Sequence, residues 1–197
     1  MKATIIIIVS ILSLLILLQA FVVKSTQQTE QHIYQVIKVY DQFEVRKYEP
    51  AIFSSVKLDT KGYKETSSSG FNVLAGYIFG DNDRSEKIAM TSPVAMELGD
   101  TSKMSFMVPK GYKIEDLPNP GNRKIVFEKQ EEKIVAAIQF DGWANDEMIE
   151  HYKSILTKEL AKEKLEHSNK FTFLGYNPPF ELVNRRNEVV VELINYK

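Results

Sequence analysis

The order of predicted strands and helices repeats once along the chain. In each half, two strand-like segments are followed by a helix with an apolar stripe and then by two more strands. The halves are offset by about 82–85 residues, so that Ile52 and Val56 correspond to Ile134 and Ile138. Identity between the halves is negligible, and the repeat is therefore one of pattern. Two such units predict an α+β fold: a distorted eight-stranded antiparallel sheet or barrel, ββαββ twice, with two helices on it.

The segments of the two halves are read from period-2 and helical apolar patterns and from turn residues. In the first half, residues 33–48 read as one or two strands, 51–58 as a strand, 62–79 as a helix, and 94–98 and 104–108 as a hairpin across 99–102. In the second half, we expect strands at 124–129 and 134–140, a helix capped by Asn145 or Asp146 that runs to about Leu165, and strands at 171–176 and 188–194.

An uncharged apolar run, residues 3–23, precedes these elements. As a helix its 21 residues would span about 31 Å, which matches a hydrocarbon core of roughly 30 Å. Lys2 supplies a short positive region, but no clean small-x-small cleavage site follows, which favours an uncleaved signal anchor at 1–23 over a cleaved signal peptide. The positive-inside rule favours a cytoplasmic N-terminus. We therefore expect a transmembrane helix, a polar linker at 24–32 and an outward-facing domain at 33–197, which would be secreted if the segment were cleaved.

Charge and cysteine content exclude several classes of function. The formal net charge is −1 at pH 7, so there is no basic surface that would indicate a nucleic acid partner. The chain has no Cys, which excludes disulfides and thiol chemistry. The expected partners are a small ligand and, through the N-terminal helix, the membrane.

The stretch YIFGDNDRSEKIAMTSPV, residues 77–94, predicts a pocket wall. It begins on a helical pattern, ends at Gly80, crosses a polar turn and enters a short segment in which Ile88, Met90 and Val94 would share one face of a strand. Pro93 lacks a backbone N–H, so this segment is not a regular central strand throughout. No acid–base dyad, metal-spaced cluster or phosphate loop is visible in it.

Eight short motifs, in order along residues 38–194, resemble the SOUL haem-binding protein family. They are VRKYEP (45–50), FxxLxxYIxG (71–80), KIxMTxPV (87–94), FxVP (106–109), LPxP (117–120), FxG (140–142), GYNPP (175–179) and RRNEV (185–189). The resemblance implies a distorted eight-stranded barrel with two helices and a twofold pseudo-repeat. It also implies non-covalent binding of haem or a related tetrapyrrole, and it brings no catalytic residues.

The resemblance and the apolar patterns together suggest a set of tetrapyrrole-binding residues. In some relatives a His just before the Tyr-x-Pro turn is the proposed iron ligand, but the matching residue here is Lys47, which leaves binding in an apolar groove with cations near the propionates. Arg185 and Arg186 are candidates for those cations, the alternative being a salt bridge to Glu188 or Glu192. The predicted cofactor-binding residues are Lys47, Phe71, Leu74, Tyr77, Ile78, Met90, Arg185 and Arg186.

The three His and the Met residues offer further ligand types. His151 is a weak candidate for an iron ligand, and a half-buried helix His is the favoured interpretation. His32 is expected to be solvated in the linker, and His167 to interact with a helix dipole. The strand Met residues, Met90, Met96, Met104 and Met107, are interpreted as flexible filler of core and pocket rather than ligands.

Three classes of function remain in order of preference. The first is a membrane-anchored, extracytoplasmic tetrapyrrole carrier, buffer or scavenger. The second is a small-molecule effector-binding or interaction module of the gyrase-inhibitor-like type, which would need a buried acid such as Glu97, Glu128 or Glu192. An enzyme ranks last because no nucleophile–base pair or metal set of motif quality is present.

Overall fold

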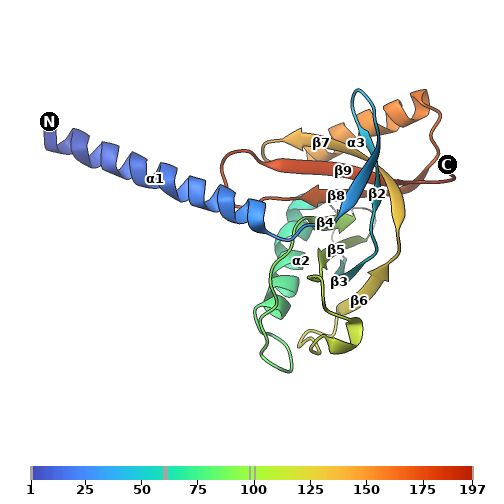
Figure 1. The fold of residues 1–197 in the computed structure, drawn as a ribbon, viewed down its shortest axis with the longest axis horizontal. Coiled ribbons are helices and arrows are strands. Elements are labelled where there is room, and N and C mark those ends of the chain that lie inside the picture. The colour runs from blue at the N-terminus through green and yellow to red at the C-terminus, as the bar shows by residue number, and fades with distance from the viewer. Residues whose placement is uncertain (1, 60–61, 98, 100, 197) are drawn as a thin grey trace.

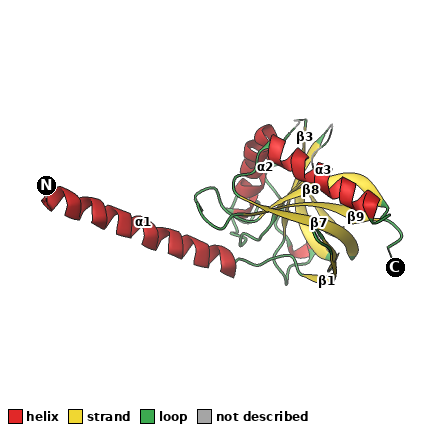
Figure 2. Cartoon of the chain, turned by 90° about the horizontal axis from the view of Figure 1, so that it is seen from above, coloured by secondary structure: helices red, strands yellow, loops and turns green. Residues whose placement is uncertain are grey.

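A curled sheet carries two helices, and a third, N-terminal helix projects away from it (Figure 1). The computed structural model describes residues 2–59, 62–97, 99 and 101–196. Seen from above in Figure 2, α2 (Tyr63–Ile78) and α3 (Asp146–Lys162) lie on the same side of the sheet. Helix α2 packs on the first half of the sheet and α3 on the second half. The predicted α+β class is confirmed.

Within the described residues, nine strands form one antiparallel sheet with the order β1-β2-β7-β9-β8-β4-β5-β3-β6. The strands are β1 (Tyr34–Val39), β2 (Glu44–Tyr48), β3 (Ala51–Leu58), β4 (Val94–Glu97), β5 (Ser102–Met107), β6 (Ile125–Gln130), β7 (Lys133–Asp141), β8 (His167–Gly175) and β9 (Arg186–Leu193). A short 3₁₀ helix, η1 (Ile114–Asp116), precedes β6.

The prediction of eight strands is wrong by one strand. Residues 33–48 form two strands because the chain turns between them, where the N–H of Tyr40 donates to the carbonyl of Phe43 at 2.8 Å. The sheet also stays open in the part of the chain that the structure describes, with β1 and β6 at its two ends, so it is a half-barrel and not a closed barrel. The predicted hairpin turn at 99–102 includes residue 100, which, like Leu98, lies outside the described residues.

Apart from β1, the strand order is symmetric under exchange of the two halves. Reading inwards, β2-β7-β9-β8 corresponds to β6-β3-β5-β4, and the two series meet where β4 pairs with β8. The first strand of each half pairs with the second strand of the other half, as β2 does with β7 and β6 with β3. The halves therefore build one continuous sheet by exchanging their first strands.

The main core lies between the sheet and the helices α2 and α3. Strand β7 shows how the sequence places it: Ala136 and Ile138 belong to the main core, while Val135 and Ala137 belong to a smaller cluster on the opposite face. Because side chains alternate along a strand, an unbroken apolar run such as 134–138 is what a strand buried on both faces requires.

The N-terminal helix α1 (Lys2–Gln28) is long and apolar enough to cross a membrane. Its candidate span is Thr4–Gln28, of 25 residues, and most of its large apolar side chains are exposed. The helix continues five residues past the apolar run, through residues 24–28. In the second half of the helix, four side chains are at least half-buried: Gln19, Val22, Val23 and Thr26. They are spaced three and four residues apart and therefore share one face of the helix.

Candidate functional site

The end of α2 and the segment that follows it form one wall of the candidate site. Helix α2 ends at Ile78, and Gly80 in the turn that follows has a φ of +116°, which is readily adopted only by glycine. The Asn82 side chain then organises the turn, donating to the carbonyls of Tyr77 at 3.1 Å and Glu86 at 2.8 Å. Ile88 returns to the helix, with its N–H donating to the Ile78 carbonyl at 2.9 Å. The turn thereby folds the next segment back onto the end of α2.

The segment after this turn is extended but forms no strand before Val94. This agrees with the expectation that the segment is not a regular strand throughout, and the expected alternation persists: Ile88 is buried, Ala89 exposed and Met90 half-buried. The side chain of Thr91 donates to the Met107 carbonyl at 2.6 Å and attaches the segment to the end of β5. An irregular backbone thus separates α2 from the start of β4, an interior strand of the sheet.

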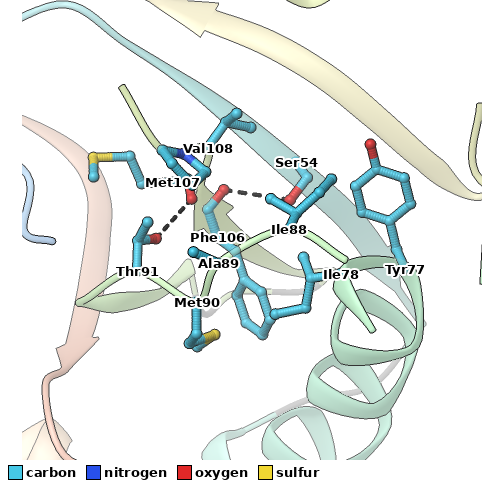
Figure 3. Close-up of a pocket in the computed structure, with 11 residues that line it drawn as sticks. Ser54, Tyr77, Ile78, Ile88, Ala89, Met90, Thr91, Phe106, Met107 and Val108 are labelled. Carbon is cyan, nitrogen blue, oxygen red and sulfur yellow. Dashed lines mark hydrogen bonds between the residues drawn. The ribbon is translucent and has the colours of Figure 1, made fainter. Parts of the chain in front are cut away.

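A small apolar pocket lies between this segment, α2 and β5 (Figure 3). Figure 3 shows the side chains of Ile78 and Met90 on either side of the Phe106 ring. The interior volume is about 10 Å³, roughly what one water molecule needs. Its lining residues are Ser54, Tyr77, Ile78, Ile88, Ala89, Met90, Thr91, Phe106, Met107, Val108 and Pro109. We call it the α2 groove.

A second pocket, of about 150 Å³, adjoins the α2 groove and shares Met107, Val108 and Pro109 with it. This pocket contains His32 and the charged side chains of Glu49 and Lys110, whereas the polar residues of the α2 groove are Ser54, Tyr77 and Thr91. It is lined by His32, Ile33, Glu49, Pro50, Ala51, Ile52, Met107, Val108, Pro109, Lys110 and Tyr112. The two pockets together offer an apolar surface next to an imidazole and an ion pair, that of Lys110 with Glu49 at 3.6 Å.

His32 is half-buried in the second pocket, so the prediction of a solvated linker His is wrong. The backbone N–H of His32 donates to the Ser92 carbonyl at 3.2 Å, so the residues before β1 lie against the segment that precedes β4. The imidazole lies 4.7 Å from the Tyr48 ring, and its Nε2 lies 2.7 Å from the Glu49 carbonyl oxygen. Burial lowers the pKa of His32 below its usual value. No local sequence signal indicates this position, because the partner Ser92 is remote in sequence.

The α2 residues predicted from the apolar stripe divide between the groove and the core. Tyr77, Ile78 and, from the following segment, Met90 line the α2 groove. Leu74 is fully buried and belongs to the core. Phe71 is 37% exposed, and its ring meets the edge of Phe106 with centroids 5.4 Å apart. Phe71 therefore extends the apolar surface of the groove towards solvent.

Tyr77 acts as an uncharged wall of the groove. Its hydroxyl donates to the Pro118 carbonyl at 3.1 Å. Burial, with the nearby Glu86 carboxylate as a smaller cause, raises the pKa of Tyr77 to about 12. The phenol stays protonated at neutral pH, and its bonded hydroxyl fixes the orientation of the ring.

The three predicted basic residues do not converge on the α2 groove. Lys47 lies on β2 and forms an exposed ion pair with Glu132 at 2.8 Å. Arg185 belongs to the loop before β9, where its guanidinium lies 4.1 Å from the Trp143 ring. Arg186 pairs with Glu188 at 2.7 Å, which is the salt bridge that the sequence suggested as the alternative to a propionate. Lys110, which the sequence interpretation missed, lines the adjoining pocket and pairs there with Glu49 at 3.6 Å.

Glu188 is the centre of a buried ionic cluster. It is fully buried, and it accepts hydrogen bonds from Arg46 at 2.8 Å, from Arg186 and from the Tyr176 hydroxyl at 3.0 Å. Burial and the adjacent Glu188 carboxylate raise the pKa of Tyr176. Two guanidinium groups thus neutralise one carboxylate, so Glu188 is not available to a cationic ligand.

The other acidic and His candidates lie outside both pockets. Glu97 and Glu128 are half-buried, Glu128 bonds with Lys103 at 3.1 Å, and Glu192 is exposed. His151 is exposed on α3, with its ring against Tyr152. Among the described residues, no group of three or more His, Cys, Asp or Glu side chains is arranged to hold a metal ion.

Comparison with known proteins gives a consistent family match. A family model described as SOUL heme-binding protein matches residues 29–192. The chain is 31% identical over 155 residues to heme-binding protein 1 of Xenopus laevis, covering 75% of this chain and 81% of the relative. It is also 31% identical over 161 residues to heme-binding protein 2 of Homo sapiens, covering 75% and 76% of the two chains.

Solved structures share the fold at much lower sequence identity. The EcmrR C-terminal domain matches with a TM-score of 0.58 and 9% identity, covering 83% of this chain and 99% of that domain. SAV2435, solved bound to tetraphenylphosphonium, matches with a TM-score of 0.50 and 8% identity, covering 78% and 94%. At this level of identity the likeness concerns the fold alone.

Proposed function

Because the chain belongs to the SOUL haem-binding protein family, we propose that its globular domain binds haem or a related tetrapyrrole non-covalently. The role would be that of a carrier, buffer or scavenger, a binding role rather than a catalytic one. The observation that carries the location of the site is the convergence of Tyr77, Ile78 and Met90 with Phe106 on one apolar groove.

The apolar side chains of the α2 groove suit a flat apolar ligand, and the small volume of the groove limits how such a ligand would lie. A cavity of about 10 Å³ is far below the roughly 300–1,000 Å³ of pockets that enclose a small molecule. The macrocycle would therefore lie across the mouth of the groove and cover the exposed parts of Phe71 and Met90. Apolar burial, at roughly 25 cal/mol per Å², would supply most of the affinity.

Met90 is the residue best placed to meet the iron of a bound haem. When bound, haem supplies an iron that accepts axial ligands such as a thioether or an imidazole. The Met90 side chain is half-buried at the mouth of the groove, on a segment without regular secondary structure, so its sulfur can adapt to a ligand. Lys110, from the adjoining pocket, pairs with Glu49 at 3.6 Å and would orient the ligand by exchanging this exposed partner for a propionate.

The membrane is the second partner in this proposal. Helix α1 has the length and composition of a membrane span, which supports a signal anchor at residues 1–23 with the domain on the extracytoplasmic side. Mass spectrometry of the membrane fraction tests this part: intact Met1-containing protein is expected, and a form lacking the N-terminal segment would indicate a cleaved, secreted protein instead.

The haem-binding part is tested by titrating the full chain in detergent micelles with hemin and following the Soret band. Saturable binding with a Kd below about 10 µM is expected, which corresponds to about 7 kcal/mol of binding free energy. No saturation in that range would overturn the proposal.

Two matched substitutions test the location of the site. Met90→Leu keeps an apolar side chain but removes the sulfur, and it should shift the Soret band and weaken hemin binding. Met96→Leu is the control, since Met96 is buried outside the groove lining. Equal spectra for both variants and the parent protein would exclude Met90 as the ligand.

A further inference from the structure

The loop that joins β8 to β9, residues 176–185, lies beside α1 (Figure 1) and exposes large apolar side chains. Phe180 and Leu182 are each 61% exposed and Val183 is 49% exposed. We call these three residues the apolar tip. Side chains of this size gathered on one loop mark an interaction surface more often than scattered exposed residues do.

Two polar residues of α1 hold this loop. The Gln19 amide donates to the Phe180 carbonyl at 3.1 Å and accepts from the Leu182 N–H at 3.0 Å. About two turns further on, the Thr26 hydroxyl donates to the buried Glu181 carboxylate. The only amide side chain inside the apolar run is therefore bonded to the loop, and two backbone groups of the loop are bonded to the helix.

The position of Gln19 sets the depth of the apolar tip if α1 spans a bilayer. Gln19 lies four residues before the end of the apolar run at Val23. At 1.5 Å per residue this is about 6 Å along the helix axis. Interfacial segments bury their apolar face about 5–10 Å into the boundary between headgroups and acyl chains. The bonds to Gln19 thus hold the apolar tip at membrane depth.

The rest of the loop has the composition of a membrane interface. Arg185 closes the loop from within, donating to the carbonyls of Pro178 at 2.9 Å and Glu181 at 2.7 Å. Its guanidinium also lies over the ring of Trp143, which is 55% exposed. Backbone groups that enter lipid must be hydrogen-bonded within the protein, and Trp and Arg are enriched where a protein crosses the interface.

We propose that the β8–β9 loop, with Trp143, is a lipid-docking surface that seats the domain on the bilayer next to α1. This inference rests on the membrane anchor in the proposed function and is independent of haem. It assigns the surface to lipid because α1, which would itself be in lipid, hydrogen-bonds the loop. The domain would then sit in a defined orientation on the membrane and not at the end of a free tether.

Trp143 is the only Trp in the chain, so its fluorescence reports on this surface alone. The full chain is reconstituted in phosphatidylcholine vesicles that contain lipid brominated on the acyl chain near the headgroup. Phe180→Asp, which places a charge on the apolar tip, should reduce quenching of Trp143 about twofold. Phe79→Asp is the matched control, because Phe79 is also highly exposed, at 64%, but lies at the C-terminal end of α2 and not on the β8–β9 loop. Gln19→Leu removes both hydrogen bonds to the loop but keeps the apolar run intact. It should reduce the quenching of Trp143 by less than Phe180→Asp does and by more than Phe79→Asp does.

The outcomes separate the docking from the anchor. Retention of the protein after alkaline carbonate extraction, with quenching that Phe180→Asp lowers and Phe79→Asp does not, supports the inference. Retention with equal quenching in all variants overturns the inference in favour of a free tether. Retention with quenching that depends on the density of the protein, and not on the bromolipid, overturns it in favour of contact with a second copy of the chain. Release by carbonate overturns the anchor and the docking together, while the hemin titration remains a separate test.

Discussion

Helices α2 and α3 occupy equivalent places in the two halves, but they are stabilised differently. Helix α3 supplies its own cap, since the Asn145 side chain accepts from the Met148 N–H at 2.8 Å. Its outer face carries ion pairs, such as Lys153 with Glu150 at 3.0 Å. Helix α2 has no side-chain cap from Gly62, and its first N–H, that of Tyr63, donates to Asp146 at the start of α3.

This difference indicates which helix can serve as a binding wall. The middle of α2 is rich in Ser, and the hydroxyls of Ser67 and Ser69 bond back to helix carbonyls, which gives little local stabilisation. Helix α2 therefore depends more on tertiary contacts than α3 does, since α3 has its own cap and surface ion pairs. The dependent helix is the one that borders the α2 groove, where adaptation to a ligand is useful.

The largest expected effect comes from removing the core residue of each helix. Leu74 of α2 and Leu156 of α3 are both fully buried. Leu74→Ala and Leu156→Ala should each lower the free energy of unfolding by about 2–5 kcal/mol, because each leaves a cavity. Denaturant unfolding of the full chain in micelles, followed by circular dichroism, measures this loss.

Hemin titration of the same two variants under folding conditions sharpens the comparison. Leu74→Ala should weaken hemin binding because Leu74 supports the wall of the groove, while Leu156→Ala should leave it unchanged. Equal weakening in both variants would mean that the groove does not depend on α2 in particular.

A smaller effect is expected from the two caps. Asn145→Ala and Asp146→Ala should each cost about 1 kcal/mol, the usual loss when a helix N–H loses its side-chain acceptor. Hydrogen exchange locates the loss: Asp146→Ala should accelerate exchange of Tyr63 and Lys64 in α2, and Asn145→Ala that of Met148 in α3. Unchanged exchange in α2 for Asp146→Ala would contradict the link between the helices.

The smallest effect concerns pH and the pocket next to α2. Burial lowers the pKa of His32, so the unfolded chain binds a proton more readily than the folded chain. The contribution of neutral His32 is complete above its unfolded pKa of about 6.5 and is lost as the pH falls below that value. Unfolding midpoints measured between pH 7 and 5 should therefore fall less steeply for His32→Gln than for the parent protein.

His151→Gln serves as the control for this measurement, because His151 is an exposed residue of α3. A pH dependence that is the same in His32→Gln and in the parent protein would show that protonation of His32 is not coupled to folding.

The local elements were predictable from the sequence, and their long-range partners were not. The apolar stripe predicted α2 within a residue at each end, and the Asn145 cap marked the start of α3. The cap that Asp146 provides to α2 joins residues 83 positions apart, and the bond between Arg46 and Glu188 joins residues 142 apart. Such pairs leave no local pattern because only the folded sheet brings them together.

The candidate site shows the same division. Tyr77, Ile78 and Met90 were accessible to sequence reasoning because they lie on one helix end and the segment after it. His32 and Lys110 were not, since a backbone contact with Ser92 and the exit from β5 bring them to the adjoining pocket. Lys47, Arg185 and Arg186 matched family motifs, but their charges are directed to Glu132, Trp143 and Glu188.

By itself, the sequence determined the apolar N-terminal helix, the α+β class and the apolar residues of the groove. Each of these follows from the spacing of side chains along one segment. Only the tertiary structure decided the ninth strand, the neutralisation of Glu188, the placement of His32 and the contact of the β8–β9 loop with Gln19. These features depend on distances between segments far apart in the chain, which are set by how the sheet curls and pairs.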